Sequence, residues 1–227
     1  MDRRAYEMNS RFLIFLFLIM SSVAHSQEKD FSYTYVELNA TQSENIGYAA
    51  TISVGLPASI YLKGSVKNED VKSKETLFQK TGQLVAIGYH SSIADIFKSV
   101  SKSGFAFNFA RIMDVYAEIG ANNWELENLE NLENLTKGST DAYVQAGVKI
   151  GDAEGWEYNL YLESSRLAEV AINPSTDEVE YALSDEVNND IGIRVINNFG
   201  DRMSLNFSLN NNDFSGASAA FGVRFRL

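Results

Sequence analysis

The sequence predicts an all-β fold: a closed, antiparallel, up-and-down transmembrane β-barrel of about 10 strands, with about 8 as the alternative. Three observations predict it. Side chains alternate between apolar and polar along most of the chain, tight connections alternate with long or polar ones, and after residue 26 no apolar stretch is long enough for a spanning helix. Strands must therefore do the crossing if the chain lies in a membrane.

The predicted strands follow one another from residue 32 to the C-terminus. They are residues 32–40, 47–56, 60–66, 82–90, 105–119, 140–150, 156–164, 190–197, 202–210 and 216–227. In the fifth, Arg111 breaks the apolar parity, so its spanning part is expected to begin after that residue. The last has a strict alternation, with Ala219, Phe221, Val223, Phe225 and Leu227 on one face. Such a strand is expected to pair on both sides and so to close the barrel.

Segments that break the alternation are predicted to be connections. Residues 127–135 read ENL three times, and a period of three matches neither strand nor helix, so an exposed loop is expected. Residues 91–102 have apolar residues at helical spacing and are expected to form a helical or irregular insert. Tight turns are predicted at Pro57, 151–155 and 197–201, and polar or charged loops at 41–45, 67–80 and 167–189.

Residues 1–26 are predicted to be an export signal peptide. Three arginines precede an apolar run, residues 12–20, that is too short to span a bilayer as a helix. Ala24-His25-Ser26 fits a cleavage site, so residues 27–227 are expected to form one barrel domain. An uncleaved signal anchor is the alternative.

Charge and cysteine content narrow the choice of partners. Without residues 1–26 the chain has 16 basic and 28 acidic residues, a net charge of -12. This acidity argues against nucleic acid and against an anionic membrane face as partners. The sequence contains no cysteine, so the fold is expected to be stable without disulfides.

Three features favour a membrane barrel over a soluble, lipocalin-like carrier. The longer connections follow the odd-numbered strands, apart from residues 91–102, as outer-membrane barrels with periplasmic termini have them. The polar face consists of Gly, Ala, Ser, Asn and Tyr with few charges, whereas a solvated exterior would have more Lys and Glu. Aromatic residues are expected at the membrane interfaces, with Trp156, Phe199 and Phe225 on the periplasmic side and Trp124 on the outer side.

The chain resembles the small outer-membrane β-barrel proteins of Gram-negative bacteria, the porin-like group related to the OmpA transmembrane domain. The resemblance covers residues 27–227 and rests on Tyr35-Val36-Glu37, Ile87-Gly88-Tyr89-His90 and residues 221–227. It implies a location in the bacterial outer membrane, with lipid and lipopolysaccharide as partners. It also implies a terminal pattern read by the outer-membrane assembly machinery, namely Phe221, Val223, Phe225 and Leu227. That pattern usually closes with an aromatic residue, and this chain ends in Leu227. No peptidoglycan-binding domain follows the predicted barrel, so tethering to the cell wall is not implied.

Ten charged residues lie at strand positions that are predicted to face inward, and they are candidates for a functional network in the lumen. These are Glu37, Lys63, Asp114, Glu118, Lys149, Glu157, Glu163, Arg194, Arg224 and Arg226. They could form a constriction that selects solutes, or buried ion pairs that fill the lumen and set the strand register. Because about 8 strands leave a filled interior, ten strands favour the filled one, and a structural or narrow porin-like role is expected.

Other functions are weighed against this one. Omptin proteases also have ten strands, and some small barrels modify lipids. Such chemistry needs a histidine beside a carboxylate or a serine. His90 is the one histidine outside the predicted signal, and it is expected to be an interfacial or turn residue, so no enzyme is predicted. Acidic residues in and beside the loop 167–189 could hold divalent cations, although a solvated loop is favoured. They are Glu169, Asp177, Glu178, Glu180, Asp185, Glu186 and Asp190. Adhesion through residues 127–135 is a third hypothesis. No cofactor or metal is expected, because the sequence has no phosphate-binding loop or metal-ligand cluster.

Overall fold

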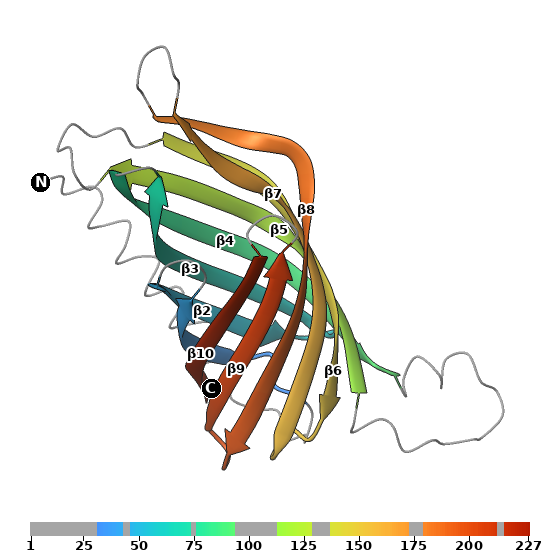
Figure 1. The fold of residues 1–227 in the computed structure, drawn as a ribbon. Coiled ribbons are helices and arrows are strands. Elements are labelled where there is room, and N and C mark those ends of the chain that lie inside the picture. The colour runs from blue at the N-terminus through green and yellow to red at the C-terminus, as the bar shows by residue number, and fades with distance from the viewer. Residues whose placement is uncertain are drawn as a thin grey trace, which may run out of the picture.

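The described part of the chain folds into ten antiparallel strands that form one closed barrel (Figure 1). The computed structural model describes residues 31–42, 46–73, 76–93, 113–128, 137–172, 179–212 and 216–227. The strands are β1 Tyr35–Gln42, β2 Ile46–Leu56, β3 Ile60–Ser73, β4 Thr76–Ser92, β5 Met113–Asn128, β6 Lys137–Gly151, β7 Trp156–Ile172, β8 Val179–Phe199, β9 Met203–Asn212 and β10 Gly216–Arg226. Among the helices of these residues, none is long and apolar enough to cross a membrane.

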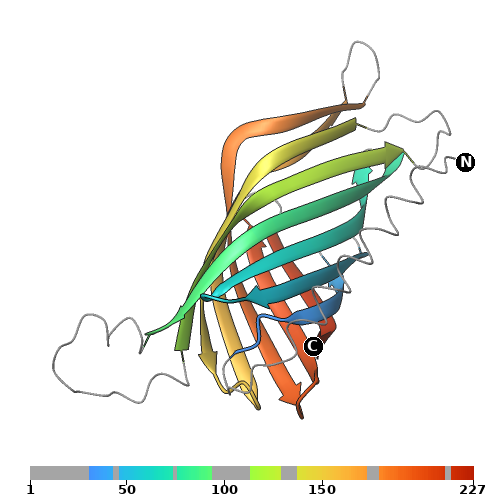
Figure 2. The same ribbon diagram turned by 180° about the vertical axis from the view of Figure 1, so that it is seen from behind.

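The last strand closes the barrel, as its alternation predicts. Each strand pairs with its neighbours in sequence, and β10 pairs with both β9 and β1, with Arg226 opposite Tyr35 and Ala219 opposite Gln42. If the pairing is followed from β1 through all ten strands and back to β1, the position on β1 is shifted by about 12 residues. This shear corresponds to strands tilted by about 40° from the barrel axis. Figures 1 and 2 show this tilt from opposite sides.

Alternation along the strands places large apolar side chains on the outside of the barrel. The exposed ones are Leu38, Ile46, Tyr48, Leu62, Val66, Val85, Ile87, Tyr89, Ile119, Val144, Trp156, Tyr158, Leu160, Leu162, Ile191, Ile193, Phe199, Met203, Phe207, Leu209, Phe221, Phe225 and Leu227. The buried residues are mostly tyrosines, amides, serines and charged groups. This distribution is the reverse of that in a water-soluble protein.

Several predicted loops are strands in the structure. Residues 67–80 were expected to form a charged loop, but β3 continues to Ser73 and β4 begins at Thr76. The expected acidic loop 167–189 is likewise mostly strand, because β7 ends at Ile172 and β8 begins at Val179. Backbone hydrogen bonds can continue a ladder whatever the polarity of its side chains, so the strands run past the end of the apolar alternation. The predicted contrast between long and short connections is correspondingly weaker.

The three tight turns are confirmed and lie at the same end of the barrel, called here the tight-turn end. They comprise residues 57–59, 152–155 and 200–202. Ala58, Ser59 and Gly200 have positive φ angles, which allow the chain to reverse within a few residues. At the opposite end, the register between β7 and β8 shifts between Arg166 and Ala168, and Figure 1 shows β8 bending sharply.

Some predictions fall on residues that the structure does not describe. These include the signal peptide, most of the insert 91–102, the first part of the predicted strand 105–119, and residues 129–135 of the ENL repeat. Glu127 and Asn128 belong to β5, so the repeat begins within a strand. Of the acidic residues expected in a loop, Asp177 and Glu178 are not described. The others belong to strands, Glu169 to β7 and Glu180, Asp185, Glu186 and Asp190 to β8.

The aromatic residues expected near the tight-turn end lie on the outer surface there, whereas the outward placement predicted for Trp124 is wrong. Trp156, Phe199 and Phe225 are exposed on the outer surface near that end. Trp124 has the same parity in β5 as the buried Glu118, and its ring lies where a Cβ on Gly82 of β4 would be. The Lys80 ammonium lies 4.4 Å from the centroid of this ring. Trp124 therefore faces the interior, because even-numbered positions in β5 point away from the apolar exterior.

Candidate functional site: the charged barrel interior

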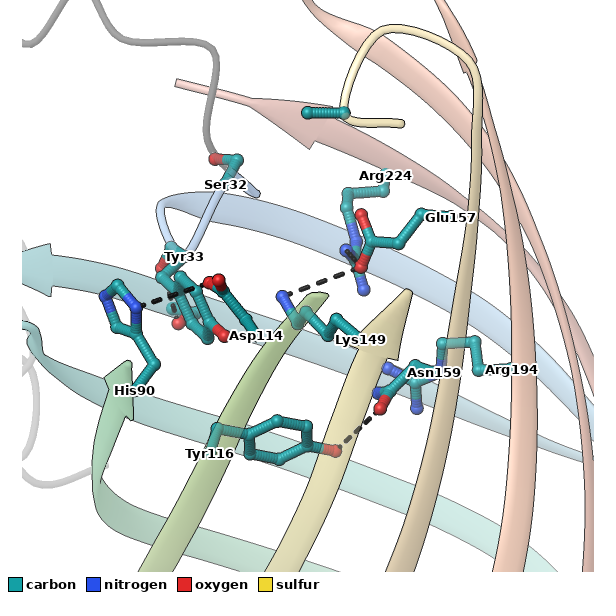
Figure 3. A network of polar contacts seen from close by, with 12 residues as sticks. Ser32, Tyr33, His90, Asp114, Tyr116, Lys149, Glu157, Asn159, Arg194 and Arg224 are labelled. Atoms are coloured by element: carbon teal, nitrogen blue, oxygen red, sulfur yellow. Dashed lines mark hydrogen bonds and ion pairs between the residues drawn. The ribbon is translucent and has the colours of Figure 1, made fainter. Parts of the chain in front are cut away.

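The ten charged residues predicted for the lumen all lie on the inner parity of their strands. Five are acidic and five are basic, so their formal charges balance. Six have buried side chains, and Lys63, Glu163, Arg194 and Arg226 are partly buried. The structure divides them into a group near the tight-turn end (Figure 3), a second group around Glu118, and Arg226 at the turns.

Glu37 is the centre of the first group and lies at the closing seam of the barrel. The register places it opposite Arg224 across the β1–β10 pair. Arg224 contacts one carboxylate oxygen, Oε2, through Nε and Nη2, both at 2.7 Å. Arg194 Nη1 lies 3.5 Å from Oε1, to which Asn39 also donates a hydrogen bond of 2.8 Å. Glu37 is 1% exposed, so this carboxylate is compensated entirely inside the protein.

Glu157 links this group to β6. Its Oε1 lies 3.6 Å from Lys149 Nζ and 4.0 Å from Arg224 Nη1. Figure 3 shows Lys149, Glu157 and Arg224 pointing toward one another from different strands. Both cations also face tyrosine rings. Lys149 Nζ is 3.8 Å from the Tyr33 centroid, and the Arg224 guanidinium is 4.0 Å from that of Tyr35. Cation–π contacts of this kind stabilise cations that have lost part of their hydration.

Glu118 is the centre of the second group. Its Oε2 forms an ion pair of 2.7 Å with Lys63 Nζ and accepts a hydrogen bond of 3.0 Å from the Tyr143 hydroxyl. Its Oε1 accepts a hydrogen bond of 2.8 Å from the Tyr61 hydroxyl. Gln145 extends the group, because its Oε1 accepts from Lys63 at 3.4 Å and its Nε2 donates to Glu163 at 3.2 Å. The hydrogen bonds of this group come from β3, β5, β6 and β7.

Asp114 faces the interior as predicted, whereas the expectation for His90 is correct only in part. His90 lies at the tight-turn end of β4, as expected, but it faces the interior and not the membrane interface. Its ring stacks on Tyr33 with centroids 3.8 Å apart, and its Nδ1 lies 3.6 Å from Asp114 Oδ2 (Figure 3). Even-numbered positions in β4, such as that of the buried Ala86, face the interior, and His90 occupies one of them.

The interior tyrosines are residues that the sequence analysis noticed without assigning a role. In the register, Tyr61 is opposite Gly88, Tyr116 opposite Gly147, Tyr143 opposite Gly120 and Tyr161 opposite Gly192. The rings of Tyr61 and Tyr161 occupy the space of the missing side chains at Gly88 and Gly192. Inward tyrosines at the level of inward glycines on the next strand are a signal that could have identified these contacts.

The C-terminal residues separate into an outer and an inner set. Phe221, Phe225 and Leu227 are exposed, as their parity predicts. Arg226 faces inward and donates hydrogen bonds to two turns, through Nη1 to the Ala153 carbonyl at 2.6 Å and through Nη2 to the Gly200 carbonyl. Among the described residues, no group of three or more His, Asp or Glu could hold a metal ion.

No protein-family model matches the chain, and no curated protein matches its sequence. Solved structures with similar architecture include the N-terminal β-barrel domain of Pseudomonas aeruginosa OprF, with a TM-score of 0.43 at 12% identity over 85% of this chain and 96% of that one. The KdgM porin has a TM-score of 0.45 at 7% identity, covering 86% and 99%. Neisserial surface protein A has a TM-score of 0.41 at 12% identity, covering 86% and 98%. We therefore argue the function from this chain's own side chains.

Proposed function

We propose that this protein is an integral β-barrel of the bacterial outer membrane with a lumen closed by its own side chains, serving a structural or narrow porin-like role. The observation that supports this most is the reversal of the two faces. Among the described residues, 23 large hydrophobic side chains are exposed on the outside, while charged groups such as Glu37 and Arg224 are buried inside. Lipid stabilises such an exterior, whereas water would not.

The predicted export signal and the arrangement of the turns support the orientation that we propose. Short turns of outer-membrane barrels face the periplasm, so the tight-turn end would lie there, together with the start of β1 and the end of β10. The proposed partners are outer-membrane lipid and lipopolysaccharide around the barrel, and the assembly machinery acting on the last strand. The exposed Phe221, Phe225 and Leu227 are the side chains that this machinery would meet.

The balance of charge supports a closed lumen over a selective pore. A selective constriction concentrates charge of one sign where the solute passes. Here the cations lie against the carboxylates of neighbouring strands, as Arg224 does against Glu37 and Lys63 against Glu118. Buried tyrosines contact these pairs, as Tyr143 does by donating a hydrogen bond to Glu118 and Tyr35 by placing its ring beside Arg224. The role that we propose is therefore structural, or that of a narrow pore without a large, steady conductance.

Two measurements on the purified protein test this function. The protein should require detergent and should migrate differently on a detergent gel before and after heating, since folded barrels resist unfolding by detergent. In planar bilayers it should insert without a large, steady conductance. A protein that stays soluble without detergent would contradict the membrane location. A large, steady conductance would contradict the closed lumen alone.

A further inference from the structure

Residues 31–34 precede β1 and lie inside the barrel at the tight-turn end. Phe31 and Tyr33 are each 6% exposed, although neither belongs to a strand. Their side chains join an apolar cluster with Tyr61 of β3, Tyr116 of β5, Tyr161 of β7 and Ala153 of the β6–β7 turn. The segment thus contacts several parts of the inner wall, and it adds two aromatic rings to the tyrosines of that wall.

Tyr33 is held on more than one side. His90 stacks on its ring at 3.8 Å and 13°, Lys149 Nζ lies 3.8 Å from the ring centroid, and the Tyr61 ring lies 4.8 Å away. Figure 3 shows Tyr33 between His90 and the Asp114 and Lys149 side chains. These neighbours come from β3, β4, β5 and β6, so one side chain bridges four adjacent strands of the ten.

The backbone of the segment is anchored to the wall near the tight turns. Ser53 Oγ donates a hydrogen bond of 2.7 Å to the Tyr33 carbonyl, and the Gly55 amide donates one of 2.9 Å to Thr34 Oγ1. The Leu227 amide donates to the Thr34 carbonyl at 3.3 Å. The segment is therefore fixed both to β2 and to the last residue of the chain.

We infer that residues 31–34 are a tethered plug that seals the tight-turn end of the lumen and is distinct from the ion pairs of the wall. This inference rests on the proposed function. The plug and the ion pairs are separable because Glu37 and Glu118 have cationic partners on the wall itself. The plug contributes aromatic burial, and the buried Tyr33 hydroxyl has no hydrogen-bond partner among the described residues. That hydroxyl would gain hydration on leaving, which lowers the cost of displacing the plug.

The test compares full-length variants in planar bilayers. Phe31→Ala combined with Tyr33→Ala removes both rings and should raise the single-channel conductance at least about fivefold over that of the original protein. Tyr33→Phe is the matched control, because it keeps the ring and removes only the unpaired hydroxyl. Its conductance should stay within about twofold of the original. Heat-dependent migration on a detergent gel verifies that each variant is folded.

Thiol labelling gives a second readout that does not depend on the double variant folding. The chain has no cysteine, so single cysteines can be introduced cleanly. Phe31→Cys keeps Tyr33 in place, and Glu154→Cys provides an exposed position in a turn at the same end. A water-soluble maleimide should label the cysteine of Phe31→Cys at least about tenfold more slowly than that of Glu154→Cys.

The outcomes separate the plug from the function on which it rests. If the folded double variant inserts but conducts no more than the original protein, the inference of a plug is wrong. The proposed closed barrel is unaffected by that result. Equal labelling rates of the two cysteine variants would overturn the plug in the same way. A protein that does not insert into bilayers at all would overturn the proposed function, and the plug with it.

Discussion

Glu37 illustrates how single residues determine the stability of this interior. It accepts from Arg224 and Asn39 and lies near Arg194, all inside the barrel. Breaking a buried ion pair costs more than the pair contributes, because the remaining partner keeps an uncompensated charge. The same reasoning applies to Glu118, whose two oxygens accept from three different side chains.

Glu37→Ala is expected to lower the free energy of unfolding by about 3–5 kcal/mol, because it leaves Arg224 buried without its carboxylate. Urea titration in lipid vesicles, followed by tryptophan fluorescence, measures this change. Asp201→Ala is the control, since Asp201 is exposed in a turn, and it should change the value by less than about 0.5 kcal/mol. A loss below about 1 kcal/mol for Glu37→Ala would show that the pair is solvated.

Gly88 is expected to tolerate no side chain, because a Cβ there would overlap the Tyr61 ring. Tyr61 is 2% exposed and its hydroxyl is bound to Glu118, so the ring has little freedom to move. Gly88→Ala should therefore destabilise the barrel by about 1–3 kcal/mol. In Gly64→Ala, the new Cβ would lie 3.6 Å from Ile52 Cγ2, an ordinary contact. Equal stability of the two variants in the same titration would contradict the ring placement.

At the scale of strands, β10 is secured from both edges and also from its end. Its backbone pairs with β1 and β9, and Arg226 reaches the turns of two hairpins, β6–β7 and β8–β9. The Arg226 amide also donates to the Arg202 carbonyl at 2.8 Å. These contacts hold the closing strand in register, since a slip would move Arg226 away from both carbonyls.

Arg226→Ala is expected to destabilise the folded barrel by about 1–3 kcal/mol, because it removes two hydrogen bonds from a charged donor. The temperature at which the folded band disappears on a detergent gel should fall accordingly. Arg202→Ala removes the same charge from an exposed turn position and should leave that temperature nearly unchanged. Similar shifts for both variants would mean that charge, and not the contacts of Arg226, is responsible.

Strand prediction succeeded in the middle of the strands and failed at most of their ends away from the tight turns. It also failed at the start of the first strand, which was predicted from residue 32 but begins at Tyr35. Alternation marks residues that have the apolar exterior on one side and the interior on the other, as in β10. Beyond the apolar belt both faces can be polar, so the alternation disappears while backbone pairing continues through Ser73 and from Thr76. Trp124 was misplaced because its position at a strand end suggested a girdle, whereas its parity points inward.

At the scale of the whole molecule, the exterior should respond to charge according to depth. Val85 lies near the middle of β4 and is 70% exposed, and Asn211 is exposed near the far end of β9. In a bilayer, Val85→Arg should lower the free energy of unfolding by about 2–4 kcal/mol and Asn211→Arg by about 0–1 kcal/mol. Urea titration in vesicles measures both. Small and equal effects would indicate that the exterior contacts water.

The sequence by itself determined the fold class of this protein, the order of its strands, and most of the sorting of residues between the two faces, while the closed sheet settled the number of strands at ten. These properties follow from period-two alternation, which is local and can be read along the chain. The tertiary structure alone decided which charges pair, because Glu37 is separated by 187 residues from Arg224 and meets it only through barrel closure and register. It also decided that residues 31–34 enter the lumen, since no local pattern specifies where a segment outside the sheet will pack.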